Sequence, residues 1–244
     1  MSPGFVPAAR ARGVELMDTG DYVPAELRSN LADLRLYNRW LGGARLVLRE
    51  LNRMLDERAG AGGAPGALSV LDVGTGSADI PLAIQRWAAR RGITAGVEGV
   101  DANAEMLAEA RLFLSREHNA RVRLRQADAC MLPHADGSVE YIVSSNFMHH
   151  LDDTEALAAL REMGRVAARG GIVVDLQRRD SALFNVWMLT RLTTRNRLTR
   201  SDGPLSVRRA FTVDEMAKLA REAGLAGARV RSAGPVRMVL TWSQ

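Results

Sequence analysis

The chain has 244 residues, enough for one well-packed α/β domain with an appendage but short for two full domains. Its hydrophobic content of 47% and charged content of 25% are ordinary for a globular protein, and no apolar run reaches the ~18 residues of a membrane span. The net charge is +5, yet aromatic residues make up only 5%, which disfavours a nucleic-acid partner. We interpret most of the arginines as solvent-exposed residues on helix faces.

The chain has a single cysteine, Cys130, and no basic start followed by an apolar segment. One cysteine excludes an internal disulfide and a thiolate metal cluster, and it agrees with a reducing compartment. We therefore expect a cytoplasmic protein without a membrane span. The oligomeric state does not follow from the sequence.

The N-terminal part of the chain differs in character from the rest. Residues 1–23 contain prolines and glycines with little periodicity, which predicts a flexible arm. Leucines then recur near helical spacing and are interrupted at Gly42 and Gly43, which predicts helices over about 24–40 and 44–58. Whether these helices only pack on the main domain or also cover a pocket stays open. A Gly/Ala/Pro linker at 59–66 separates them from the main domain, which begins at residue 67.

A glycine-rich loop opens the main domain. The stretch Val70 to Pro81 combines an apolar run, an acid, two glycines and an amphipathic continuation, which indicates strand, tight loop and helix. Asp79 stands where a dinucleotide fingerprint has its third glycine, and a carboxylate there would repel a pyrophosphate while suiting a helix start. No Gly-Lys-Ser/Thr follows, so a P-loop is excluded. The loop predicts a nucleoside cofactor without a diphosphate.

Two further strands also end in acids. A second strand over 93–101 ends in Asp101, at about the distance from the loop where α/β nucleotide sites place a carboxylate on ribose hydroxyls. The third strand, 122–127, is followed by Asp128 and Ala129. An acid with an adjacent backbone N–H can bind the amine and the ring nitrogen of adenine.

Two adjacent histidines follow the fourth strand, 139–145. The segment from Asn146 to Leu151 lies beyond the carboxyl end of that strand, where parallel sheets bind ligands. His150, with His149 behind it, is a candidate base for a phenol or enol proton, although a histidine there can instead order the loop. Because adjacent histidines on one loop seldom converge on one ion and no distant third ligand is evident, we expect no metal, even with Asp152 and Asp153 nearby.

The remainder continues the alternation of helix and strand, with one break. A helix over 153–168 ends in a left-handed turn at Gly170 and Gly171, and a fifth strand covers 172–176. Residues 181–200 then break the pattern with an apolar helix that either covers an opening or belongs to the core. Thr212 and Glu215 form a capping box for a helix that ends near Gly224, and two short strands follow over 228–231 and 236–242.

The glycine loop with Asp72, the segment 99–107 and the pattern Gln126 to Ala129 resemble three motifs of the class I S-adenosylmethionine-dependent methyltransferases. The similarity is greatest to small-molecule enzymes of quinone biosynthesis and natural-product methylation. It is specific over about residues 67–180 and holds only in outline for the tail. Ala78 departs from the family pattern at the third glycine, and we expect its methyl group near the cofactor path.

The resemblance implies an α/β fold: a Rossmann-like three-layer sandwich with a mostly parallel seven-stranded sheet, an antiparallel last strand pair and an N-terminal helical extension. It divides the chain into a flexible arm (1–23), a helical cap (24–58) and a methyltransferase domain (67–244) with an apolar insert at 181–200 that builds an acceptor pocket. His150 is the implied catalytic residue. The residues implied to bind S-adenosyl-L-methionine are Asp72, Gly74, Thr75, Gly76, Asp101, Ala102, Asp128, Ala129 and Asn146.

The resemblance also implies a small-molecule acceptor, with O-methylation of a phenolic or polyketide-like aromatic compound preferred. C-methylation of a quinone precursor is the next alternative. An RNA methyltransferase, favoured only by the basic charge, and a non-catalytic module that only binds the cofactor are the remaining ones. The three strand-end acids argue against the last alternative, because a protein that had lost the activity would not need them.

Overall fold

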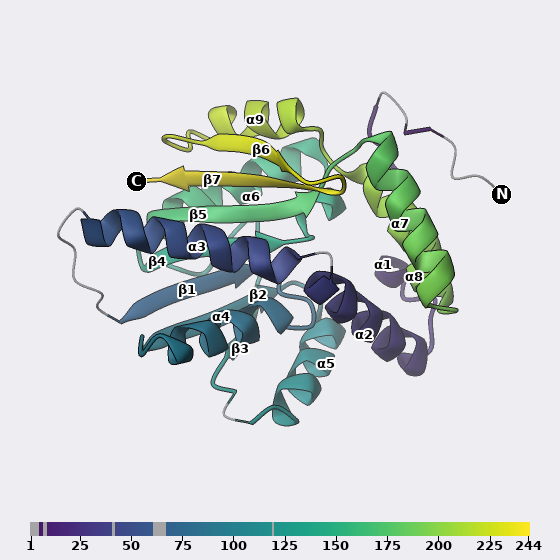
Figure 1. Cartoon of the computed structure of the whole chain (residues 1–244), viewed down its shortest axis with the longest axis horizontal. Coiled ribbons are helices and arrows are strands. Elements are labelled where there is room, and N and C mark those ends of the chain that lie inside the picture. Colours follow the sequence, from purple (N-terminus) through teal and green to yellow (C-terminus); the bar gives the residue numbers. More distant parts are fainter. Residues whose placement is uncertain (1–4, 7–8, 41, 61–66, 119) are drawn as a thin grey trace.

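The computed structural model describes residues 5–6, 9–40, 42–60, 67–118 and 120–244, and its centre is a seven-stranded sheet (Figure 1). The strand order is β3-β2-β1-β4-β5-β7-β6. The first five strands run parallel, whereas β7 is antiparallel to both β5 and β6. The strands are β1 (Leu68–Val73), β2 (Ala95–Asp101), β3 (Arg123–Gln126), β4 (Val139–Ser145), β5 (Ala167–Leu176), β6 (Arg229–Ala233) and β7 (Arg237–Ser243). The predicted fold class is confirmed.

Helices cover both faces of the sheet. On one face α3 (Gly43–Gly60) and α4 (Asp79–Arg90) bury apolar side chains against β1, β2 and β4. On the other face, α6 (Asp153–Val166) and α9 (Val213–Glu222) pack against the sheet. This contact forms the larger hydrophobic cluster, which includes the fully buried Trp242 of β7. The helix α5 (Ala104–Ser115) packs against β3 at the sheet edge. These layers leave the carboxyl ends of the parallel strands uncovered.

Four further helices lie at those carboxyl ends, as Figure 1 shows: α1 (Leu16–Thr19), α2 (Pro24–Trp40), α7 (Asp180–Thr193) and α8 (Arg197–Arg209). Polar side chains join them. Asn30 on α2 donates to Thr199 on α8, and Tyr37 hydrogen-bonds Thr193 at the end of α7. These helices close over the point where β1 and β4 lie side by side and the strand order reverses, the usual ligand site in such sheets.

The N-terminal arm makes more contacts than its sequence pattern suggests. Arg10 donates to the carbonyls of Leu151 and Arg209 and pairs with Asp153. The amides of the first α1 residues donate to the Asp202 carboxylate on α8. These contacts are made by isolated polar side chains, which do not produce a regular spacing of apolar residues in the sequence. The division into arm, cap and domain remains a prediction, and linker residues 61–66 lie outside the described part.

The helix α8 was not predicted as such, because Gly203 and Pro204 lie in its middle and both disfavour helix interiors. Proline lacks the N–H that would bond the carbonyl of Arg200, four residues earlier. Arg191 on α7 donates to that carbonyl instead, at 3.1 Å. The neighbouring helix therefore satisfies the backbone group that the proline leaves open.

The pair Gly170 and Gly171 lies inside β5 and does not form the predicted helix-ending turn. The helix α6 ends at Val166, and the strand starts at Ala167. A Cβ atom at Gly171 would lie 2.3 Å from the Trp242 ring, and one at Gly170 would lie 2.1 Å from the Trp242 carbonyl oxygen. The glycines are therefore explained by the close passage of β7.

Among the described residues, no helix is long and apolar enough to cross a membrane.

Candidate functional site

A cavity of about 320 Å³ lies between the carboxyl ends of the strands and the helices α1, α2, α7 and α8. Eight of the ten predicted site residues line it: Asp72, Gly74, Thr75, Gly76, Asp101, Ala102, Asn146 and His150. The other two, Asp128 and Ala129, are not among the lining residues. Asp128 accepts a hydrogen bond from the amide of Cys130, and Ala129 is buried in the core. The sequence therefore identified the cavity, but the structure does not place the predicted adenine contacts on its wall.

The glycine loop follows β1 and reaches the cavity because two positions have backbone conformations that favour glycine. Gly74 has a φ of 72°, and a Cβ atom there would lie 2.2 Å from the Phe147 ring. Gly76 has a φ of 50° and open space beside it. Ala78, whose methyl group we expected near the cofactor path, is fully buried in a cluster with Leu82 and α5 and is not among the cavity-lining residues.

Asp72 is buried at the floor of the cavity, with 1% of the residue exposed. Its Oδ1 atom has no hydrogen-bond partner among the described residues. Burial and the nearby Asp79 and Asp101 carboxylates hold the pKa of Asp72 well above its usual range, and the nearby Thr75 side chain only partly offsets them. A positively charged ligand group near this carboxylate would relieve both the burial and the repulsion.

Asp101 joins the loop to the end of β2. Its two carboxylate oxygens accept hydrogen bonds from the amides of Gly76 and Asn103, each at 2.9 Å. Burial raises the pKa of Asp101, and these two amides partly counteract the effect. Each carboxylate oxygen can accept a second hydrogen bond, so the group can also receive two ligand hydroxyls.

A buried polar network, of which the sequence predicted only Asn146 as a site residue, also lines the cavity. Arg237, 3% exposed, donates to Asn146 at 2.6 Å, and Asn146 donates to Asn38 at 2.6 Å. Asn38 in turn donates to Asp79 at 3.0 Å. Burial lowers the pKa of Arg237 to about 10, and its Nε has no partner among the described residues. The four residues come from β7, the end of β4, α2 and α4, so no local sequence motif contains all of them.

The two histidines lie in the short helix η1 (Met148–His150) and each contacts a carboxylate through Nδ1. His149 is buried and lies 2.6 Å from Asp175 Oδ1, while its amide donates to the other carboxylate oxygen of Asp175. His150 lies 3.0 Å from Asp18 Oδ2. Asp152 and Asp153 do not join them, because Asp152 caps α6 and Asp153 pairs with Arg10.

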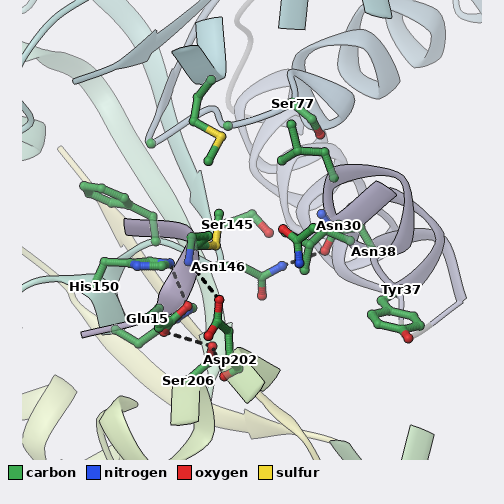
Figure 2. Close-up of a pocket in the computed structure, with 18 of the residues that line it drawn as sticks. Glu15, Asn30, Tyr37, Asn38, Ser77, Ser145, Asn146, His150, Asp202 and Ser206 are labelled. Carbon is green, nitrogen blue, oxygen red and sulfur yellow. Dashed lines mark hydrogen bonds and ion pairs between the residues drawn. The ribbon is translucent and has the colours of Figure 1, made fainter. Parts of the chain in front are cut away.

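A third acid, Glu15, faces both histidines. Its carboxylate lies 3.8 Å from His149 Nε2 and 4.0 Å from His150 Nε2, and it accepts a hydrogen bond from Ser206. Figure 2 shows His150, Glu15, Ser206 and Asp202 gathered on one side of the cavity, with Asn30 and Asn38 of α2 across from them. Glu15 is only 2% exposed. It comes from the N-terminal arm, and no sequence motif relates it to the two histidines.

The environment of His150 bears on its predicted role as a base. Burial alone would lower the pKa of its imidazole, but Glu15 and Asp18 outweigh burial and raise this pKa to about 9. His150 is therefore protonated at neutral pH, which opposes proton abstraction and favours hydrogen-bond donation to an oxygen. Its catalytic role stays a prediction.

The chain is similar to known methyltransferases over part of its length. Residues 70–171 match the family model described as "Methyltransferase domain". Demethylmenaquinone methyltransferase from Halalkalibacterium halodurans is 34% identical over 109 residues, which make up 45% of this chain and 42% of that protein. The Staphylococcus aureus enzyme of the same name is 33% identical over 110 residues, 45% of this chain and 43% of its own length. The chain thus matches less than half the length of these relatives.

Solved structures agree on the fold. A SAM-dependent methyltransferase from Aquifex aeolicus has a TM-score of 0.55 and 19% identity, covering 77% of this chain and 88% of its own. Magnesium protoporphyrin IX methyltransferase from Synechocystis PCC 6803, solved with bound SAH, has a TM-score of 0.55 and 16% identity over 84% of both chains. Residues 70–171 are thus similar to a methyltransferase domain, and for this part the resemblance to class I S-adenosylmethionine-dependent methyltransferases is confirmed.

Proposed function

We propose that the protein transfers a methyl group from S-adenosylmethionine to a small molecule. One observation carries the proposal: a single cavity joins the glycine loop, Asp72 and Asp101 to the histidine pair. The first group suits a nucleoside with a positively charged tail, and the second suits an acceptor that carries oxygen. Because the cofactor brings its own leaving group, the protein needs mainly to align acceptor and methyl group for in-line displacement.

In this proposal, each part of the cofactor faces a polar group of the cavity with complementary charge or hydrogen-bonding capacity. Asp101 would accept hydrogen bonds from the ribose hydroxyls, and Asp72 would face the positive charges of the methionyl part. Arg237, with Asn146 and Asn38, would face its carboxylate. This arrangement explains why atoms of Asp72 and Arg237 have no partner among the described residues. Asp128 and Ala129 would reach the adenine only if the cofactor extends past the cavity lining toward β3.

The acceptor end of the cavity has apolar walls from α2, α7 and the end of β5: Leu31, Leu34, Leu176, Val186 and Leu189. Such walls suit a flat apolar compound, and protonated His150 would donate a hydrogen bond to its oxygen. We therefore propose O-methylation of a phenolic or polyketide-like aromatic acceptor. In this arrangement, α2 of the predicted cap (24–58) covers the cavity, whereas α3 packs on the sheet, and the insert at 181–200 forms one wall.

C-methylation of a quinone precursor is the second candidate. It is favoured by the name of the relatives, demethylmenaquinone methyltransferase. Turnover with isotope-labelled cofactor, followed by NMR of the product, separates the two, because a methyl group on oxygen and one on a ring carbon have different chemical shifts. Methylation of neither compound class would leave the acceptor part of the proposal without support.

Calorimetry with S-adenosylmethionine tests the cofactor claim. We expect binding by the wild type, and Asp101→Ala should weaken it more than tenfold because two charge-assisted hydrogen bonds are lost. Glu98→Ala is the matched control, since Glu98 lies on the same strand but is not among the cavity-lining residues. An absence of binding up to millimolar concentration would contradict the proposal. Binding without any turnover would favour the non-catalytic module.

A further inference from the structure

Three possible metal ligands converge at the acceptor end of the cavity. Glu15, His149 and His150 each offer one ligand atom, and these atoms all lie within 4.8 Å of one another. All three residues line the cavity. Bonds of about 2.0–2.2 Å to a common ion would place ligand atoms about 3–3.4 Å apart, so metal binding requires a contraction on the order of 1 Å. No distant third ligand is evident in the sequence, but in the structure Glu15 of the N-terminal arm supplies one.

The surroundings orient both rings as metal sites do. Nδ1 of His149 lies 2.6 Å from Asp175, and Nδ1 of His150 lies 3.0 Å from Asp18. A ring that donates its Nδ1 proton to a carboxylate presents Nε2 as a ligand, which is the usual arrangement of histidines that bind metals. Here both Nε2 atoms face the same third carboxylate, Glu15.

The electrostatics of the cluster also call for a cation. A metal ion bound to both Nε2 atoms would displace the proton of His150 and would supply the positive charge that this ring otherwise carries beside Glu15. The cluster holds three carboxylates, those of Glu15, Asp18 and Asp175. Arg209 lies beside it, but this guanidinium donates to the carbonyls of Gly13, His149 and His150. The centre of the cluster therefore favours a cation.

We propose that Glu15, His149 and His150 bind a divalent first-row transition metal at the acceptor end of the cavity. Two imidazoles and one carboxylate suit iron(II) or zinc, and three protein ligands leave coordination positions for a further oxygen. A hydroxyl of the acceptor bound there would lose its proton to solvent at lower pH than when free, and no oxidant or reductant is required. The metal would thus replace the base that His150 was expected to be.

The experiment measures metal binding alone and so is independent of the proposed methyl transfer. The full chain, stripped with a chelator, is titrated with Zn²⁺ and with Co²⁺ by calorimetry and visible absorption. We expect one ion per chain at micromolar affinity or better, with ligand-field bands for Co²⁺. An absence of binding up to millimolar concentration would overturn the proposal, even if S-adenosylmethionine binds.

Variants identify the ligands. Glu15→Gln keeps the size of the side chain, and its amide oxygen can still accept from Ser206, yet it should lower the affinity for Zn²⁺ more than tenfold. His150→Gln should do the same. His134→Gln is the matched control, because His134 also faces a carboxylate, Glu98 at 3.4 Å, but is not among the cavity-lining residues. Equal affinity in Glu15→Gln and the wild type, with both proteins folded by circular dichroism, would refute the site.

Discussion

The buried carboxylate of Asp72 should destabilise the protein when no ligand is bound. Replacing Asp72 with Asn removes the charge at nearly constant size and should stabilise the ligand-free protein at neutral pH by about 1 kcal/mol or more, about 3 °C in Tm. Because the folded-state pKa lies above the usual 3.8, the wild type loses stability as the pH rises from about 4 through that folded-state pKa. The difference between variant and wild type should therefore grow over this range.

Thermal unfolding of both proteins at a series of pH values measures this difference. Asp214→Asn, at an exposed position on α9, is the control and should show little pH-dependent change. Binding of S-adenosylmethionine should change in the opposite direction, with weaker binding to Asp72→Asn. If the variant were less stable than the wild type at every pH, the carboxylate would instead contribute to folding.

At the residue scale, spacing along the chain predicted part of the cavity. Asp72, Gly74 and Asp101 belong to local patterns of strand, loop and strand end, and the structure places them together. Glu15 and Arg237 lie in the arm and in the last strand, and they reach the cavity only through tertiary packing. Neither a regular spacing nor a motif could relate these distant positions, so Arg237 of the polar network and Glu15 were not predicted.

The close contact between the paired strands β5 and β7 can be tested with two glycines of the sheet. Gly171→Ala should lower the free energy of unfolding by about 3 kcal/mol or more, because the new Cβ atom would meet the buried Trp242 ring and the backbone oxygen of Ile142. Gly96→Ala, on β2, is the matched control. Nothing lies within 4 Å of its added Cβ atom, so the change should stay within about 0.5 kcal/mol.

Denaturant unfolding of the two variants and the wild type measures these differences. Equal stability of Gly171→Ala and the wild type would mean that the two strands do not pack as closely as described. Since both variants add one methyl group within the sheet, their comparison removes the intrinsic difference between glycine and alanine.

At the element scale, the alternation of strands and helices in the main domain followed from apolar runs, capping residues and turns. The capping box of α9, with Thr212 and Glu215, lies where the sequence placed it. The errors came where tertiary contacts override local preference. Pro204 lies inside α8 because Arg191 satisfies the open carbonyl, and Gly171 lies inside β5 because Trp242 fills the space above it.

Over the whole molecule, the excess of arginine serves the fold in several places. Among the arginines of α7 and α8, Arg197 pairs with Glu26. Arg191 and Arg200 donate to each other's backbone carbonyls, and Arg209 donates to those of η1. Guanidinium groups engaged in this way are poorly placed to bind successive phosphates.

We therefore expect the purified protein to retain no nucleic acid, even at low salt. The ratio of absorbance at the wavelengths of bases and of aromatic side chains, followed by a binding titration with duplex RNA, measures this. A phosphate-driven partner would bind tightly at low salt and dissociate as salt rises. Tight, salt-dependent binding would revive an RNA acceptor and count against the small-molecule proposal.

The cavity is built from a central stretch of the chain and two flanking ones. The glycine loop, Asp72, Asp101 and the two histidines lie within residues 70–171, whereas the remaining walls, with Asn38 and Arg237, come from residues 15–38 and from 176 onward. Similarity over residues 70–171 therefore carries information about the methyl donor and little about the acceptor of the methyl group. Two proteins could be closely similar over this stretch and still differ in substrate, and exchanging the flanking segments between them, with Asn38 and Arg237 kept, should transfer substrate choice while leaving donor binding in place.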